Sequence, residues 1–451
     1  GPPSDRQGRR PRGASALLDH YATTLPNGLQ VLIQESHTTP VATFWLWYRV
    51  GSRNETPGTT GVSHWVEHLL FKGTQSYPSG TMMRLIDRLG GRWNAFTWKD
   101  YTAYFEVLPA DRIETAVRLE ADRMQHAIFD ADVVASERTV IISEREGAEN
   151  FPSYILREEV DALAFKAHPY RQPVIGWKED LRAITRDDLY RHYRTYYHPG
   201  NAIAVAVGAF DTTAMAALIE TAFGEIPPGP PPPPVRAVEP EQSGERRVVL
   251  RRPGGATAYL HMAYHVPAAS HPDLAPLLVL DGVLSGFKGI AAFDGGGGGR
   301  SSRLYRALVD GGLATEASSA LTPSADPTVF RIMATVRSGV EVAAVEAAVH
   351  GEVARLQEEP VPSSELDKVK RQALAQFVYL RDGVSRRAVA LGSFAAVDRP
   401  QTLAALADAV GRVTADDVAR VAGTYLLETR RTVGSYLPDG APRRARVEQA
   451  A

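Results

Sequence analysis

A run of prolines divides the chain into two parts of similar length. Residues 226–235 read IPPGPPPPPV, and because proline neither continues a helix nor donates to a sheet, this segment predicts a semi-rigid extended spacer. At 451 residues the chain is also too long for one small core. We therefore predict two domains joined by a linker. The predicted bounds are a flexible leader at 1–15, a first domain at 16–226, a linker at 227–245, a second domain at 246–438 and a C-terminal tail at 439–451.

The second part repeats the pattern of the first in the same order. Residues 258–266 (AYLHMAYHV) align with 42–50 (ATFWLWYRV), and both are rich in the apolar and aromatic residues of a buried strand. A helix that begins near Glu365 corresponds to one that begins near Glu137. Repetition at this length predicts an internal duplication. The fold class is therefore predicted as α+β, with two tandem homologous domains, each a mostly antiparallel sheet covered by helices.

Turn residues and periodicity outline the first domain in more detail. Asn27 and Gly28 before an apolar run predict a turn followed by a strand. Residues 41–50 predict a buried central strand, and 94–108 predict two strands around a turn at 99–100. Helices are predicted at 82–89, 110–128, 132–149, 154–167 and 186–197, and a further strand at 201–208.

Composition excludes several classes of function. The net charge is -2, so nothing in it favours nucleic acid or an anionic membrane as a partner. No apolar run approaches the about 20 residues that a membrane-spanning helix needs. The chain has no cysteine, so a bound metal ion must be held by His, Asp or Glu. We expect a protein without a membrane span or a disulfide.

Residues 61–74 (GVSHWVEHLLFKGT) carry the most informative motif. The apolar spacing predicts a helix that stops at Gly73, and on a helix His64 and His68 lie one turn apart on the same face. Two imidazoles on one face are the usual start of a zinc site, and Glu67 leans over that face. The order His-x-x-Glu-His is the inverted zinc-hydrolase signature. The alternative is a partly exposed helix whose histidines meet no metal ion.

A catalytic zinc site needs a third protein ligand and one open position. The predicted helix after Asp132 offers Glu137, Glu144 and Glu146. In the second part of the chain, Gln372 stands at the place of Glu144, and the apolar helix around 277–284 carries no metal ligand. Loss of a carboxylate in the half without histidines favours Glu144 as the third ligand. A solvated charged helix face remains the alternative.

With these motifs in place, the chain resembles the pitrilysin family, whose smaller members include the mitochondrial processing peptidase and bacterial relatives of it. The resemblance spans nearly the whole chain after the leader. It also rests on Asn27-Gly28-Leu29, Asn94-Ala95-Phe96-Thr97, His168-Pro169-Tyr170 with Ile175-Gly176, and Ser302-Arg303-Leu304-Tyr305. It implies that one zinc ion is bound by His64, His68 and Glu144. It further implies that Glu67 is the general base and that Glu137 is a carboxylate beside a zinc histidine.

The residue types suit this chemistry. Two neutral imidazoles and one carboxylate leave zinc with a net positive charge, which lowers the pKa of a bound water. Glu67 is then free to take a proton from that water and to pass it to the leaving amine. A carboxylate such as Glu137 would orient a histidine and raise its basicity.

The resemblance also makes predictions about substrate and partner. Asn94, Ala95, Phe96 and Thr97 would form an edge strand that receives the substrate peptide as an added β-strand, although an ordinary strand beside a turn fits these residues equally well. Family members that work alone, and the zinc-free subunit of paired ones, carry an Arg and a Tyr seven residues apart that bind the substrate backbone. Those positions fall on Leu308 and Thr315.

The resemblance therefore implies a heterodimer with a homologous zinc-free subunit, with a homodimer as the less favoured arrangement. The predicted function is a zinc metalloendopeptidase subunit that cleaves extended or unfolded peptides, including leader or presequence peptides. A structural subunit or a peptide-binding scaffold of the same fold is the alternative. A bacterial, periplasmic or exported location is expected by analogy with related proteins. The glycine-rich insertion that ends at Gly295–Gly299 predicts a flexible loop rather than a phosphate site.

Overall fold

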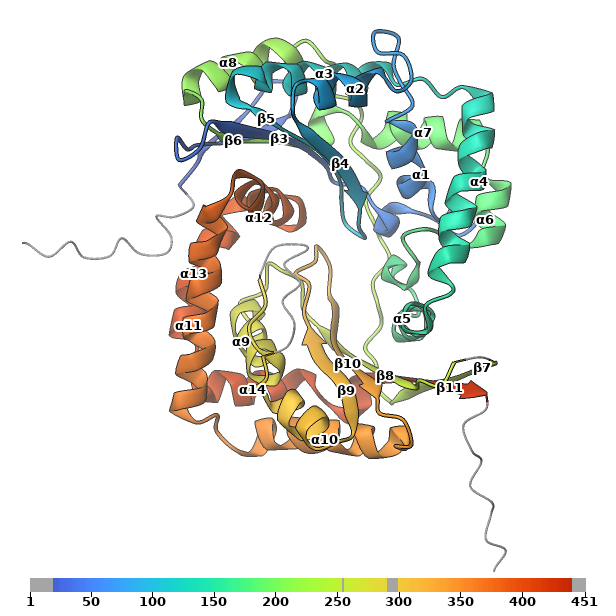
Figure 1. Cartoon of the computed structure of the whole chain (residues 1–451), viewed down its shortest axis with the longest axis vertical. Coiled ribbons are helices and arrows are strands. Elements are labelled where there is room, and N and C mark those ends of the chain that lie inside the picture. Colours follow the sequence, from blue (N-terminus) through green and yellow to red (C-terminus); the bar gives the residue numbers. More distant parts are fainter. Residues whose placement is uncertain (1–18, 254, 290–298, 440–451) are drawn as a thin grey trace, which may run out of the picture.

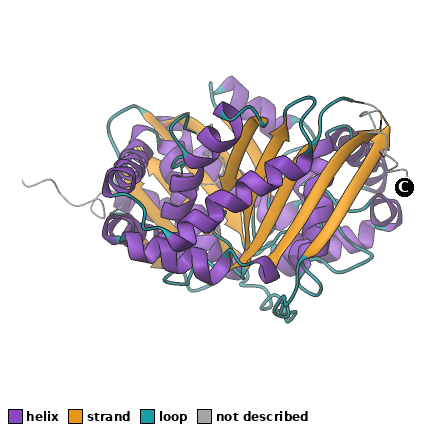
Figure 2. Cartoon of the chain, turned by 90° about the horizontal axis from the view of Figure 1, so that it is seen from below, coloured by secondary structure: helices purple, strands orange, loops and turns teal. Residues whose placement is uncertain are grey.

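The computed structural model describes residues 19–253, 255–289 and 299–439. The predicted leader, most of the glycine-rich insertion and nearly all of the predicted C-terminal tail lie outside the described residues. The described chain forms two sheets, one before and one after the proline-rich segment, and both are accompanied by helices (Figure 1). The predicted α+β fold is confirmed. Figure 2 shows long helices lying across the strands.

The first sheet contains six strands in the order β1-β2-β6-β3-β5-β4. Neighbouring strands are antiparallel except for the parallel pair β2 and β6. The strands are β1 (Tyr21–Thr24), β2 (Gln30–Glu35), β3 (Val41–Tyr48), β4 (Arg92–Thr97), β5 (Thr102–Pro109) and β6 (Ala202–Gly208). The turn between β1 and β2 contains Gly28 with a φ of 90°, which explains why the sequence has glycine there.

The second sheet contains five strands in the order β7-β11-β8-β10-β9, and again one pair, β7 and β11, is parallel. This order matches β2-β6-β3-β5-β4 of the first sheet strand for strand, so the duplication read from the sequence is present in the topology. The strands are β7 (Arg246–Pro253), β8 (Tyr259–Val266), β9 (Ala314–Ala320), β10 (Thr328–Val336) and β11 (Arg431–Asp439). Residues 227–245 between the sheets contain no helix or strand.

The helices follow the same repetition. Two helices in corresponding places begin with the same capping box, in which Thr185 and Thr414 each exchange hydrogen bonds with an aspartate three residues later. The helices of the first half are α1 (Val62–Leu69), α2 (Thr81–Arg88), α3 (Ile113–His126), α4 (Ala131–Ala148), α5 (Pro152–Ala164), α6 (Lys178–Ala183), α7 (Arg186–Tyr196) and α8 (Thr212–Phe223). Those of the second half are α9 (Leu274–Ser285), α10 (Val342–Glu358), α11 (Ser363–Tyr379), α12 (Val384–Val397), α13 (Pro400–Arg412) and α14 (Ala415–Tyr425).

Both faces of the first sheet are buried at β3, which explains the nearly continuous apolar sequence of this strand. Phe44, Leu46 and Tyr48 belong to a core with the helices of the first half. Trp45 and Trp47 point to the opposite face and belong to a core that is shared with the second half. A strand that is covered on both sides has no solvent-facing position for a polar residue.

The two halves exchange one helix each. Helix α12 of the second half packs against β3 and β6 of the first sheet (Figure 1), where Gly392 lies so close to Trp47 that any side chain would collide with the indole. Helix α5 of the first half packs against β8 and β11 of the second sheet, and Gly434 makes the matching close approach to Val160. The first sheet therefore depends on a helix that comes after the proline-rich segment, and the second sheet on one that comes before it.

A polar contact joins the halves near the β4–β5 turn. The loop between β9 and β10 brings Asp326 within 2.5 Å of the Arg53 Nε and within 2.9 Å of the His168 Nε2. In the same place the Asp100 carboxylate accepts hydrogen bonds from the Tyr170 hydroxyl and from the backbone N–H of Ala325. The second half thus contacts the turn that connects two strands of the first sheet.

One local prediction differs from the structure. The motif helix ends at Leu69, one turn before the predicted stop, and Gly73 instead supplies a φ of 115° in the following turn. In the second half a π-helix spans Tyr305–Asp310. Among the described residues, no helix combines the length and the apolar character needed to cross a bilayer.

Candidate metal centre

The N-terminus of α1 is fixed by residues that lie outside the motif. The Glu55 carboxylate accepts the backbone N–H groups of Gly61 and Ser63, at 2.8 and 2.9 Å. This acceptor satisfies two of the four N–H groups that a helix leaves unpaired at its start. Gly61 has a φ of 88°, and a side chain there would collide with the carbonyl oxygen of Ile175. The start of α1 therefore packs directly against the loop that contains Ile175 and Gly176.

Three side chains from α1 and α4 converge at one point. The Nε2 atoms of His64 and His68 lie 3.7 and 3.6 Å from the Glu144 Oε2. The candidate ligand atoms of His64, His68 and Glu144 all lie within 4.8 Å of one another, and this is the one such group found among the described residues. The sequence predicted these three residues as ligands, and the structure brings all of them together.

Glu137 fixes the orientation of one of the two imidazoles. Its Oε1 lies 2.9 Å from the Nδ1 of His68, and because a carboxylate accepts, Nδ1 carries the proton and Nε2 is left free towards Glu144. The other oxygen of Glu137 pairs with the Lys72 Nζ at 2.6 Å. Lys72 lies one turn beyond His68, so Glu137 bridges a histidine and a lysine that follow one another along α1 and the turn after it.

The charges around the site differ between the two histidines. Burial and the neighbouring His68 lower the pKa of His64 to about 3, so this imidazole stays neutral. Burial alone would lower the pKa of His68, but the hydrogen bond to Glu137 and the charge of Glu144 hold it above its usual value. A raised histidine pKa indicates that the surrounding carboxylates stabilise positive charge at this point.

Glu67 lies on the same helix but has a different partner. Its Oε2 accepts a hydrogen bond of 2.6 Å from the Thr97 hydroxyl on β4. The side chain is buried, and burial raises the pKa of its carboxyl to about 7 although the hydrogen bond from Thr97 opposes the rise. A carboxyl group with a pKa near 7 can both accept and return a proton at neutral pH.

The four residues predicted to bind substrate lie on β4. This strand is the last one of the first sheet and pairs only with β5 among the described strands. Asn94 is exposed and Ala95 is buried, as expected for alternating side chains on a strand. Thr97, at the end of β4, donates its hydroxyl proton to Glu67.

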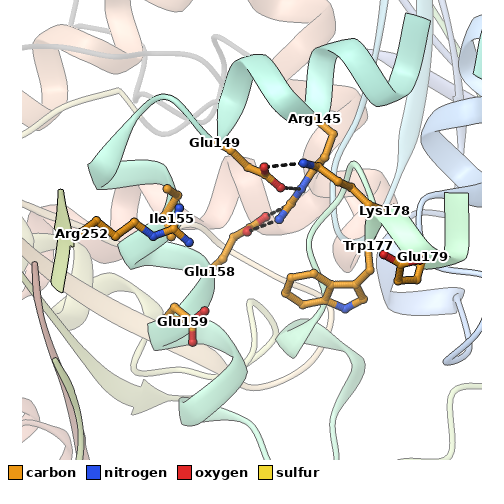
Figure 3. Close-up of a pocket in the computed structure, with 9 residues that line it drawn as sticks. All are labelled: Arg145, Glu149, Ile155, Glu158, Glu159, Trp177, Lys178, Glu179 and Arg252. Atoms are coloured by element: carbon orange, nitrogen blue, oxygen red, sulfur yellow. Dashed lines mark hydrogen bonds and ion pairs between the residues drawn. The ribbon is translucent and has the colours of Figure 1, made fainter. Parts of the chain in front are cut away.

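Glu146, the other carboxylate that the sequence offered, points elsewhere. It is 3.6 Å from the Lys178 Nζ. Arg145, which follows Glu144 and points about 100° away from it around the helix, is held between Glu149 and Glu158 (Figure 3). The pocket drawn there contains none of the candidate ligands. What it shows is how the C-terminal end of α4 is anchored.

The donor set fits zinc. Two imidazoles and one carboxylate are a ligand set of catalytic zinc sites, and they leave a fourth position open. Zinc bonds of about 2.0 Å in a tetrahedron place ligand atoms roughly 3.3 Å apart, close to the separations between Glu144 and the two histidines. The absence of cysteine agrees with a His/Glu site.

Some contributors to the site were not anticipated from the sequence. Lys72 could have been found, because it lies four residues after His68 and therefore one turn further along. Glu55 gave no signal, since it caps α1 across a loop. The two positions at which the resemblance places the missing Arg/Tyr pair differ in exposure. Leu308 is fully buried in the core of the second half, whereas Thr315 is exposed on β9.

Comparison with known proteins agrees with this geometry. Residues 30–178 match the sequence profile of the insulinase family (peptidase family M16), and residues 183–373 match that of the peptidase M16 inactive domain. The zinc protease PqqE of Helicobacter pylori is 30% identical over 425 residues, which cover 93% of each chain. The chain belongs to the M16 peptidase family.

Two further comparisons show how far the similarity reaches. The mitochondrial-processing peptidase subunit beta of Blastocladiella emersonii is 26% identical over 90% of this chain and 86% of its own. The crystal structure of a protease from Helicobacter pylori superposes with a TM-score of 0.88 at 29% identity, over 93% of this chain and 99% of that one. The inactive-domain profile covers most of the second sheet, where α9 and Gln372 replace the ligand-bearing residues.

Proposed function

We propose that this chain is a zinc endopeptidase subunit that cleaves extended or unfolded peptides. The observation that carries the proposal is the convergence of His64, His68 and Glu144, with the Glu67 carboxylate on the same helix. The similarity to zinc proteases of the M16 family supports it. Under this proposal His64, His68 and Glu144 hold one zinc ion, and the residues around them have separate tasks.

Zinc, when bound, would polarise the scissile carbonyl and lower the pKa of water at the site. Glu67 accepts a proton from the attacking water and delivers it to the departing amine, because its carboxyl titrates near neutral pH. Glu137 keeps His68 in the tautomer whose Nε2 faces Glu144. Lys72 neutralises the second oxygen of Glu137, so that this carboxylate does not turn towards the site.

The substrate class follows from β4. A terminal strand presents unpaired backbone N–H and C=O groups, to which an extended peptide can add as a further strand. Recognition through the backbone makes little demand on the peptide sequence, but it excludes folded segments, whose backbone groups are already paired. Leader and presequence peptides are extended and fit this requirement.

We further propose that the chain works with a homologous zinc-free subunit. Leu308 and Thr315 cannot supply the forked, charged donor of an arginine or the phenol of a tyrosine, and one relative carries the name of a subunit. Turnover by the lone chain should rise when such a subunit is added. Full activity of the lone chain, unchanged by the added subunit, would leave a homodimer as the better reading.

The decisive test is turnover of a quenched, unstructured peptide by the purified chain after metal analysis. We expect about one zinc per chain, cleavage inside the peptide, loss of activity with a chelator and recovery with added zinc. Zinc binding without turnover, even with the homologous subunit present, would instead support a structural subunit. Peptide binding without turnover would support a scaffold.

A further inference from the structure

Thr97 connects the proposed peptide-binding strand to the proposed base. Its hydroxyl donates a hydrogen bond of 2.6 Å to one oxygen of Glu67. Since a hydroxyl has a single proton, Thr97 cannot donate to a substrate at the same time. The bond also restricts rotation of the Glu67 carboxylate and leaves its other oxygen to receive a proton.

The position of Thr97 is itself fixed from behind. It pairs with Thr102 across the β4–β5 hairpin, where the two hydroxyl oxygens are 3.3 Å apart. Thr102 is fully buried and donates its own proton to the carbonyl of Val50. The hairpin turn is in turn held at Asp100 by Tyr170 and by the backbone of Ala325 from the second half. The β4–β5 hairpin that carries Thr97 is therefore held in place by contacts at Thr102 and at Asp100.

The second half contains a similar contact without a metal site. Asp281 on α9 accepts a hydrogen bond from the Ser319 hydroxyl on β9, which is the terminal strand of the second sheet. A carboxylate on a helix and a hydroxyl on the edge strand thus occur in both halves. This pair offers a matched control, because breaking it removes the same kind of contact far from the histidines in sequence.

We infer that Thr97 is a positioning residue that holds Glu67 for proton transfer, rather than a substrate-binding residue. The inference rests on the proposed function. It differs from the prediction made from the sequence, which placed Thr97 with Asn94, Ala95 and Phe96 in contact with the peptide. A substrate-binding residue would change KM, whereas a positioning residue changes kcat.

The test compares Thr97→Val, Thr97→Ser and Ser319→Ala with the wild-type chain. Thr97→Val keeps the branched shape but removes the proton donor. We expect kcat to fall about tenfold to a hundredfold, the usual effect of losing an orienting hydrogen bond at a metal site, with KM within about twofold of its original value and the zinc content unchanged. Thr97→Ser should restore most of kcat. Ser319→Ala should lower Tm while leaving kcat unchanged.

A double variant that combines Thr97→Val with Glu67→Gln tests whether Thr97 acts on the rate through Glu67. If Thr97 acts through Glu67, adding Thr97→Val to Glu67→Gln should lower the residual rate no further. An equal loss of rate in both backgrounds would overturn the inference. So would an unchanged kcat in Thr97→Val, a rise in KM alone, or an equal loss of kcat in Ser319→Ala.

A second measurement keeps the inference separate from the proposed function. In the metal-free chain, Tm is measured for Thr97→Val, Glu67→Leu and the double variant. A hydrogen bond between the two side chains predicts that the Tm losses are not additive. If the wild-type chain cleaves no peptide, the proposed function fails while this cycle still decides whether Thr97 holds Glu67. Additive losses would overturn the contact itself.

Discussion

The two halves of this molecule share a strand order but differ in what they place at the same points. Helix α1 carries His64 and His68, whereas α9 in the second half is apolar apart from Asp281 and Ser285. Glu144 on α4 faces the histidines, whereas Gln372 on α11 accepts a hydrogen bond from the backbone N–H of Phe287. The fold therefore requires a helix and an edge strand at these places, but it does not require metal ligands.

The carboxylates next to the candidate metal site also differ between the two halves. Glu137 pairs with His68 and Lys72, while the corresponding Glu365 pairs with Arg303. In both halves a buried or half-buried carboxylate meets a cation, so the carboxylate belongs to the architecture. Only in the first half does that carboxylate also meet an imidazole. Comparison of the halves thus separates residues that build the fold from those that carry chemistry.

The largest expected effect comes from removing the proposed base. Glu67→Gln keeps the shape of the side chain and can still accept the hydrogen bond from Thr97, but it cannot take up a proton at neutral pH. We expect a loss of about 10² to 10⁴-fold in kcat, with zinc content unchanged, measured on the unstructured peptide. Loss of zinc together with activity would show that Glu67 is a ligand.

Making the first half resemble the second is the next test. Glu144→Gln copies the amide found at Gln372 and should weaken zinc binding by more than about a hundredfold, because orienting contacts alone cost about 10- to 100-fold. The measurement is zinc affinity by competition with a chelator. The reverse change, Gln372→Glu, should create no zinc site, since α9 offers no histidine. Retained affinity in Glu144→Gln would point to another ligand.

Replacing the cation beside each of the two matching carboxylates should affect zinc affinity in the first half but not in the second. Lys72→Met leaves Glu137 with His68 as its remaining partner and should lower zinc affinity about tenfold. Arg303→Met removes the matching partner of Glu365 and should lower Tm without affecting zinc. Both variants are measured by chelator competition and by thermal unfolding. Equal effects of the two on zinc affinity would remove the distinction between the halves.

The smallest effect concerns the contact that joins the halves. Burial would raise the pKa of Asp326, but hydrogen bonds from His168 and Arg53 lower it to about 2. A lowered pKa means that the contact stabilises the fold at every pH above the unfolded value of about 3.9 and loses this contribution as pH falls towards 2. Asp100 faces the same cluster, and burial together with the charge of Asp326 raises the pKa of its carboxyl.

Thermal unfolding of the wild-type chain and of Asp326→Asn tests this directly. The Tm difference between them should be constant above about pH 5 and should shrink as the pH is lowered through the range from about 4 to 2. Protonation of carboxylates that do not interact with Asp326 lowers both Tm values and cancels in the difference. A difference that grows on acidification would contradict the assignment.

The features that could be predicted from sequence are the local ones. The turn at Gly28, the buried strand β3, the β4–β5 turn and the spacing of His64 and His68 all follow from neighbouring residues and a helical or alternating period. Glu144 could be predicted as a ligand because the second half of the chain has a glutamine, Gln372, at the corresponding position. These signals need no knowledge of which distant elements meet.

The features that could not be predicted depend on long-range packing. Nothing near Gly392 or Gly434 indicates that each receives a side chain from the opposite half. Glu55 caps α1 across a loop, and Thr97 was assigned to the substrate because its sequence neighbours lie on an edge strand. Side-chain alternation gives the face of the strand but not the partner of a hydroxyl at its end.

The exchange of α5 and α12 has a consequence for biosynthesis. A ribosome delivers the first sheet long before residue 384, where α12 begins, so the face that carries Trp45 and Trp47 emerges without its cover. Apolar surface of this kind is prone to aggregate until it is buried. The nascent chain must therefore remain incompletely folded through the proline-rich segment and most of the second half. The two halves therefore reach the native state as one event.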